Sequence, residues 1–395
     1  MELIINNRSY AVNQPFDKGG EAEIYQLNDD FAAKVYHSHI LTDERKQKVL
    51  ALCTAYDTNI SQFGQTAFAF PQFPAYTDRT DIDHLNGFSM SYFKGCPPLT
   101  EGFYDLTAFE FRSKASYQFD DKSAINFIYD IFEHAYRLHK AKIVLGDINS
   151  KNILCNFHSA RPQPIFVDLD AAQIAEFDCT AVYTEDYLDP LVEKQGKKPN
   201  GSYFYSSESD IFSLACLCYQ FFVGAHPFYM RSHPPHPKEE NMSEGISILR
   251  YLKEPEYFAT KGIEYFSHPE NQIKEERLKI LERLDPGLFN FFVAVFVKNE
   301  RTNLIFSLPS QDPRNPRSLF LKECGIEKSL GEIKYKQRQE KQKRLEAKAT
   351  KFYVPKSDIQ KVVRPRKPQA DPPELTLFLK QYGIDYSQLL KGNVV

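Results

Sequence analysis

Three polar side chains near the middle of the chain have the types and spacing that phosphate chemistry requires. Asp147 and Asn152 lie five residues apart in the stretch IVLGDINSKNIL at residues 143–154, and Asp168 ends the next apolar run. A carboxylate can accept the proton of a hydroxyl group, and carboxylate and amide oxygens are ligands of magnesium. We therefore expect Asp147 to act as a general base, and Asn152 and Asp168 to hold magnesium bound to a triphosphate.

A glycine turn and a lysine near the N-terminus would hold the phosphates. Gly19 and Gly20 lead into an apolar strand, and Lys34 interrupts a second one, FAAKVY, at residues 31–36. A bare backbone can lie over phosphates while one ammonium group on the neighbouring strand reaches them. The turn and Lys34 are thus candidates for binding a nucleotide.

The elements that position these groups follow from periodicity and capping. Residues 42–56 predict a helix that begins at the N-cap Thr42. Residues 122–140 predict a second helix, because apolar residues recur every three or four positions, and it runs directly into the Asp147 loop. Short strands are predicted at residues 3–5, 9–12, 68–73 and 87–92.

The order of these motifs resembles the protein kinase superfamily. LGD at 145–147 stands where kinases have His-Arg-Asp, and DLD at 168–170 stands where they have Asp-Phe-Gly. SDIFSL at 209–214 and GAHPF at 224–228 match a kinase helix and its exit. The Gly-Asp pair and the V-D-x-D pattern are most similar to a diverged bacterial branch of the eukaryotic-like serine/threonine kinases.

The resemblance implies an α+β fold of two lobes, with ATP and Mg²⁺ between them. Residues 1–93 would form a small lobe, a five-stranded sheet with one helix, and residues 94–325 a mainly helical lobe. The implied reaction is transfer of the γ-phosphate of ATP to a serine or threonine hydroxyl of a protein substrate.

The resemblance also implies further roles for single residues. Glu44 would pair with Lys34, although it also suits the helix dipole as part of an acidic first turn. The backbones of Ser91 and Phe93 would face the adenine, and Asp210 would accept backbone N–H groups of the Asp147 loop.

The chain departs from the kinase pattern at three places. Asp17 and Ala22 replace two glycines of the glycine loop. Gly146 replaces the arginine with which a phosphorylated activation segment pairs. The segment ends at Asp189-Pro190-Leu191 instead of Ala-Pro-Glu, which puts its anchoring ion pair in doubt.

Composition changes after the kinase-like part of the chain. Residues 326–352 predict a charged helix, residues 353–373 a linker rich in proline and lysine, and residues 374–395 short amphipathic helices. The amphipathic helices of this C-terminal extension could dock on the body of the protein or on a partner.

The overall composition favours a folded cytoplasmic protein. The chain has 395 residues, 42% of them hydrophobic, with 32 Phe and 23 Tyr, which excludes a mainly disordered chain. A net charge of −3 gives no case for nucleic acid or an anionic membrane. The seven cysteines are scattered along the sequence and form no C-x-x-C motif, so we expect them to be reduced thiols. No apolar stretch is long enough to span a membrane as a helix.

Two other classes remain open. One is a small-molecule phosphotransferase of the aminoglycoside or choline kinase kind, whose H-G-D loop is close to residues 145–147. The segment 209–228 argues against it, because those enzymes lack this block. The other is a pseudokinase that acts as a scaffold, which the altered glycine loop favours and the joint presence of Lys34, Asp147 and Asp168 disfavours.

Overall fold

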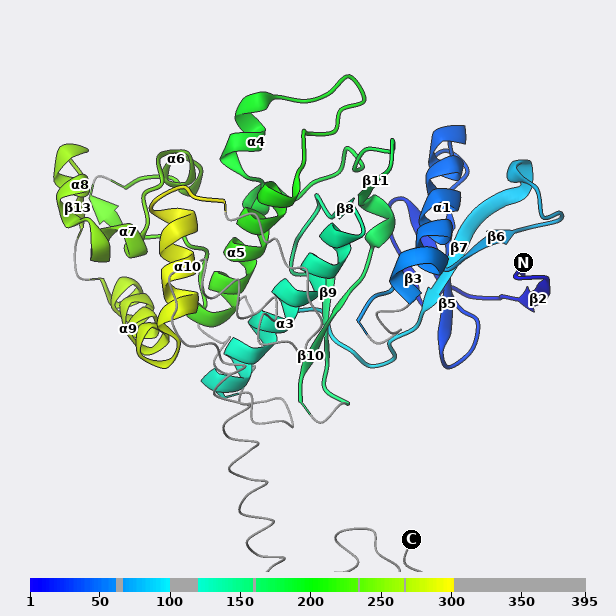
Figure 1. The fold of residues 1–395 in the computed structure, drawn as a ribbon, viewed down its shortest axis with the longest axis horizontal. Helices are drawn as coiled ribbons and strands as arrows, with labels where there is room; N and C mark the ends of the chain where they lie inside the picture. The colour runs from blue at the N-terminus through cyan, green and yellow to red at the C-terminus, as the bar shows by residue number, and fades with distance from the viewer. Residues whose placement is uncertain (62–66, 100–119, 159–160, 234, 266–267, 302–395) are drawn as a thin grey trace, which may run out of the picture. The chain divides into compact units, whose positions relative to one another are not determined.

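The structure is a computed structural model that describes residues 1–61, 67–99, 120–158, 161–233, 235–265 and 268–301 (Figure 1). All of these belong to one compact unit of the chain. The charged helix, the linker and the amphipathic tail predicted for residues 326–395 lie outside the described residues.

The N-terminal part is an antiparallel sheet of seven strands in the order β2-β1-β6-β7-β5-β4-β3. The strands are β1 (Glu2–Ile5), β2 (Arg8–Ala11), β3 (Asp17–Lys18), β4 (Ala22–Gln26), β5 (Phe31–Tyr36), β6 (Phe73–Tyr76) and β7 (Leu85–Ser91). Lys34 lies on β5 between β4 and β7, with Ile24 and Phe88 as its cross-strand neighbours. The glycine turn joins β3 to β4 at the edge of this sheet.

Two predictions about the sheet were wrong. It has seven strands rather than five, and the strand expected at residues 68–73 begins only at Phe73. The apolar residues Phe68 and Phe70 are instead buried in the core of the helical part. An apolar run of this length indicates burial, and it does not show which layer buries it.

Helix α1 (Asp43–Ala55) packs on the sheet, and a single π-helical turn, η1 (Tyr56–Ile60), follows it (Figure 1). The hydroxyl of Thr42 accepts a hydrogen bond of 3.2 Å from the backbone N–H of Arg45, so the predicted N-cap is confirmed. Val49 and Cys53 contact the sheet in one apolar cluster with Phe88. The helix therefore lies directly behind the strand that carries Lys34.

The C-terminal part is mainly helical. Its longer helices are α3 (Asp121–Lys140), α5 (Ser207–Val223), α9 (Pro269–Leu284) and α10 (Pro286–Phe296). The shorter ones are α4 (Pro190–Gln195), α6 (Lys238–Glu244), α7 (Ile248–Lys253) and α8 (Pro255–Thr260), with 3₁₀ turns η5 (Leu169–Ala171) and η6 (Glu185–Tyr187). A third 3₁₀ turn, η3 (Ile82–His84), belongs to the N-terminal part and precedes β7. Short strand pairs complete it: β8 (Ile143–Val144) with β11 (Gln173–Ile174), β9 (Ile153–Asn156) with β10 (Gln163–Phe166), and β12 (Ser232–His233) with β13 (Glu264–Tyr265).

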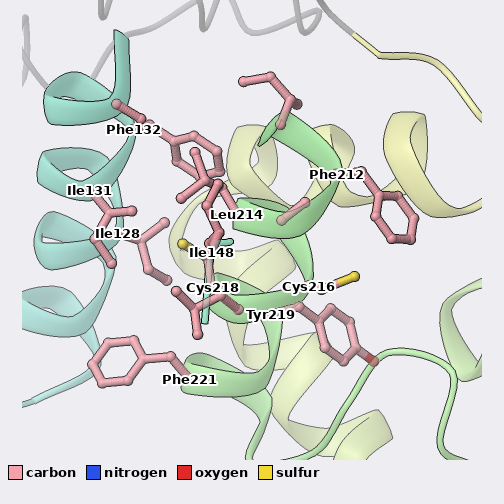
Figure 2. Packing of buried hydrophobic residues seen from close by; sticks show 14 of the residues in the cluster. Ile128, Ile131, Phe132, Ile148, Phe212, Leu214, Cys216, Cys218, Tyr219 and Phe221 are labelled. Atoms are coloured by element: carbon pink, nitrogen blue, oxygen red, sulfur yellow. The ribbon is translucent and has the colours of Figure 1, made fainter. Parts of the chain in front are cut away.

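The core of this part is built around α5. Fourteen of the seventeen residues of α5 are buried, so the helix is enclosed on nearly every face. Figure 2 shows its side chains facing Ile128, Ile131 and Phe132 of α3. The ring of Phe132 also meets that of Phe291 of α10 edge-on at 5.0 Å. The six cysteines in the described part are free thiols, and Cys216 and Cys218 are buried in this core.

Two strand pairs bring the acidic loops together. The loop after β8 and the turn after β10 are held by the pairs β8–β11 and β9–β10, and the backbone N–H of Val167 donates to the carbonyl of Asn152 at 2.9 Å. The residues between these strands are 145–152 and 167–172.

No helix among the described residues is both long and apolar enough to cross a membrane.

Candidate active site

The loop that carries Asp147 is held in place by hydrogen bonds to the side chain of Asp210. This carboxylate lies in the first turn of α5, is 1% exposed, and accepts the backbone N–H groups of Leu145 at 2.7 Å and Gly146 at 2.9 Å. His139 of α3 contacts the same carboxylate at 2.7 Å. The role predicted for Asp210 is confirmed: it is buried and accepts backbone N–H groups of the loop.

Asp147 and Asn152 are held together within the loop. The carboxylate oxygen Oδ1 of Asp147 accepts hydrogen bonds from Thr184 at 3.0 Å and from Asn149 at 3.2 Å. The side-chain amide of Asn152 donates to the backbone carbonyl of Asp147 at 3.0 Å. Burial raises the pKa of Asp147 above its ordinary value, and these hydrogen bonds oppose the shift. A carboxylate with a raised pKa holds a proton better, as a general base requires.

Asp168 lies opposite this loop, in the left-handed region of the backbone with φ of 59°. Its side chain is 43% exposed and accepts a hydrogen bond from the ammonium of Lys34. Partial burial raises the pKa of Asp168, and the positive charge of Lys34 opposes this. The negative charge of Asp147 raises the pKa further, so the two carboxylates share one electrostatic environment.

Lys34 has a second partner that was missed in the sequence. Its ammonium donates to Asp170 at 2.8 Å, and the hydroxyl of Tyr36 donates to the same carboxylate at 2.5 Å. Burial would raise the pKa of Asp170, but the charges of Lys34 and Arg45 outweigh it and lower that pKa. The second Asp of V-D-L-D was the available signal, because a buried carboxylate needs cationic partners.

The expected pairing of Glu44 with Lys34 was wrong. Glu44 is exposed in the first turn of α1, while Arg45 and Lys48 face the loop of Asp168. Successive helix residues are rotated by about 100°, so a neighbour of Glu44 occupies the inward position. Lys48 donates to the backbone carbonyls of Ala171 at 3.1 Å and Asp178 at 2.7 Å. Burial lowers the pKa of Lys48 to about 8.

The other predicted nucleotide contacts lie at or just beyond the ends of strands. Gly19 donates its backbone N–H to Ala22 at 2.9 Å, and a side chain at Gly20 would meet nothing within 4 Å, so the turn is open on that side. Ser91 is buried at the end of β7, where its hydroxyl accepts a hydrogen bond of 2.8 Å from Gln72. The carbonyl of Phe93 accepts from Cys96 at 3.3 Å, and its N–H has no partner in the described part of the chain.

The end of the activation segment is anchored, contrary to the doubt raised by its missing glutamate. The guanidinium of Arg301 donates to both carboxylate oxygens of Asp189, at 2.9 and 3.0 Å, and both side chains are buried. The carboxylate therefore comes from the residue before Pro190. Arg301 follows α10, more than a hundred residues away, and the sequence contained no local signal for this pair.

Comparison with known proteins agrees with this geometry. The family model of the protein kinase domain matches residues 102–314, more than half of the chain. An Aurora kinase of Yarrowia lipolytica is 29% identical over 121 residues, an alignment that covers 28% of this chain and 28% of that protein. The fold is thus a bilobal α+β fold of the kinase kind, and the chain belongs to the protein kinase domain family.

The family match begins at residue 102. The N-terminal sheet, the glycine turn and Lys34 therefore lie outside the matched segment. Their assignment depends on the contacts described above, above all the meeting of Lys34 with Asp168.

Proposed function

We propose that this protein is a Mg²⁺- and ATP-dependent serine/threonine protein kinase. One observation carries the proposal: Lys34, from the N-terminal sheet, and Asp168, from the helical part, meet beside the loop that holds Asp147 and Asn152. These are the groups that in-line phosphoryl transfer uses, and they come from three separate segments of the chain.

The side chains of Asn152 and Asp168 suit a magnesium ion. The amide nitrogen of Asn152 is engaged by Asp147, while its oxygen has no hydrogen-bond partner among the described residues. The carboxylate of Asp168 is partly exposed. Magnesium usually takes one or two protein oxygens and keeps several waters, so one charged and one neutral oxygen fit it. The bound ion would offset the negative charge that develops on the phosphates.

The two oxygens of Asp147 have different tasks in this proposal. Oδ1 accepts two hydrogen bonds, which fix the carboxylate, whereas among the described residues Oδ2 has only a contact of 3.5 Å with Asn152. Oδ2 is therefore the oxygen that orients the acceptor hydroxyl and takes its proton. Lys34 neutralises the α- and β-phosphates, and the backbone N–H of Phe93, which has no partner among the residues that the structure describes, offers a donor to the adenine edge.

The test is transfer of radiolabelled phosphate from ATP in the presence of magnesium, with a generic protein acceptor and, separately, with aminoglycoside or choline. We expect label in the protein, recovered as phosphoserine or phosphothreonine. Label in the small alcohol alone would support the small-molecule phosphotransferase class. Binding of ATP without any transfer would support the scaffold class, and either result would overturn the proposal.

A further inference from the structure

Five charged side chains of alternating sign run from the glycine turn to the loop of Asp168. In order they are Glu21, Arg45, Asp170, Lys34 and Asp168. Arg45 lies 2.6 Å from Glu21 and 3.5 Å from Asp170, and Lys34 lies 2.8 Å from Asp170. This chain of charges connects the glycine turn, α1, strand β5 and the turn η5.

Asp170 is the central member of this series. Its side chain is 1% exposed and contacts donors from two elements, Lys34 and Tyr36 of β5 and Arg45 of α1. A buried carboxylate of this kind is tolerated only while its partners remain, and removing one partner leaves an uncompensated buried charge. The positions of β5 and α1 therefore depend on the same carboxylate.

The helix contributes only cations to this contact. Arg45 reaches Asp170, and Lys48, one turn further along α1, donates to the carbonyls of Ala171 and Asp178. The carboxylate that binds Lys34 is thus on the loop of Asp168 and not on α1. A displacement of α1 would break the contacts of Arg45 and Lys48 but would leave Lys34 paired with Asp170.

We propose that Asp170 is the residue that positions Lys34 for the nucleotide and that, through Arg45 and Glu21, it couples this lysine to α1 and the glycine turn. The inference rests on the proposed function, because it assigns Lys34 to the nucleotide. It also predicts how the site is regulated: a partner that moves α1 would release the glycine turn through Glu21 and would remove one of the two cations that hold Asp170 beside Lys34.

The first test compares Asp170→Asn with Asp43→Asn, which removes an exposed aspartate of α1. ATP affinity is measured by displacement of a fluorescent ADP analogue, and the opening of residues 43–55 by hydrogen exchange. Asp170→Asn should weaken ATP binding at least tenfold, equal to about 1.4 kcal/mol, and speed exchange in α1. Asp43→Asn should leave both unchanged. Wild-type affinity and exchange in Asp170→Asn, or a loss of affinity in Glu44→Gln alone, would overturn the proposal.

The second test is a double-mutant cycle with Arg45→Gln. Once Asp170 is neutral, Arg45 has lost this partner, so its replacement should cost little. We expect the double variant to bind ATP at least fivefold better than the product of the two single effects implies. Strictly multiplicative losses would refute the coupling. If Asp170→Asn does not fold, Arg45→Gln alone must speed exchange at the glycine turn and in residues 168–172, and unchanged exchange there would refute it.

These measurements separate the inference from the proposed function. Binding and hydrogen exchange require no turnover, so a wild-type protein that binds ATP without transferring phosphate would refute the kinase proposal and leave the coupling intact. If the wild type transfers phosphate, Asp170→Asn should raise KM for ATP more than it lowers kcat. An unchanged KM would refute the coupling and leave the kinase proposal intact.

Discussion

At the scale of single residues, a buried histidine links stability to pH. Nδ1 of His226 accepts the backbone N–H of Phe228 at 3.4 Å, so Nε2 carries the proton and donates to the carbonyl of Asp186 at 2.8 Å. This arrangement is that of a neutral ring. Burial lowers the pKa of His226 to about 4. The folded state therefore binds fewer protons than the unfolded state between about pH 4 and 6.5, and this part of the stability is lost as the pH falls through that window.

We expect the free energy of unfolding to fall by about 2 kcal/mol between pH 8 and pH 5 on account of His226 alone. Urea unfolding at both pH values, in wild type and in His226→Gln, measures this contribution. The pH effect should shrink in His226→Gln and persist in His233→Gln, which changes an exposed histidine. An equal pH effect in all three proteins would show that the fold does not lower the pKa of His226.

Residue types predicted some of the site but not the long-range ion pairs. Asp147, Asn152 and Asp168 were predicted from their spacing within a few strand and loop residues, where geometry is local. The pairs of Lys34 with Asp170 and of Asp189 with Arg301 join residues more than a hundred positions apart. Which residue of α1 faces the loop of Asp168 depends on the rotation of the helix about its axis. In the structure this residue is Arg45 and not its neighbour Glu44.

At the scale of elements, the segment between Asp168 and Leu191 is already bound to the loop of Asp147 and to α5. Thr184 donates to Asp147, and the hydroxyl of Tyr187 donates to Gln220 at 2.9 Å. Gly146 has φ of 72°, and a side chain there would come within 2.5 Å of the sulfur of Cys179. An arginine that could pair with a phosphorylated segment is therefore excluded at this position.

We accordingly expect activity without phosphorylation of this segment. Phosphatase-treated wild type and the variant Thr180→Ala with Tyr183→Phe should both keep turnover within a few fold of untreated protein. Thr184 and Tyr187 are left unchanged, because replacing them would remove the contacts just described. A loss of tenfold or more in both the treated protein and the variant would show that the segment is a phosphorylation switch.

The positions of the helices were easier to predict than which segments join the sheet as strands. The N-cap and the 3.6-residue period of α1 and α3 are local signals, and both helices form as expected. The run at residues 67–70 is apolar enough for a strand, but the main core of the helical part buries Phe68 and Phe70. Which core takes an apolar segment depends on the whole chain, so the sequence alone did not decide it.

At the scale of the whole molecule, the C-terminal extension differs in composition from the kinase-like part, because it is rich in charged residues after Ser329 and then rich in proline. The main apolar cluster runs from Leu52 to Val297, and the family match ends at residue 314. We expect a protein that ends at Lys328 to keep its thermal unfolding midpoint within a few degrees and to retain ATP turnover. Residues after that point would then serve partner choice or location. An insoluble or inactive truncated protein would show that the C-terminal extension belongs to the core or to its regulation.

The central claim is that Asp147 accepts the proton of the acceptor hydroxyl at a site built by Lys34, Asn152 and Asp168. Label incorporation from ATP should therefore be compared in wild type and Asp147→Asn, with ATP binding measured on the same samples. We expect incorporation to fall by about 10²-fold or more, while ATP affinity and the unfolding midpoint stay close to wild type. Equal incorporation by the two proteins would contradict the account.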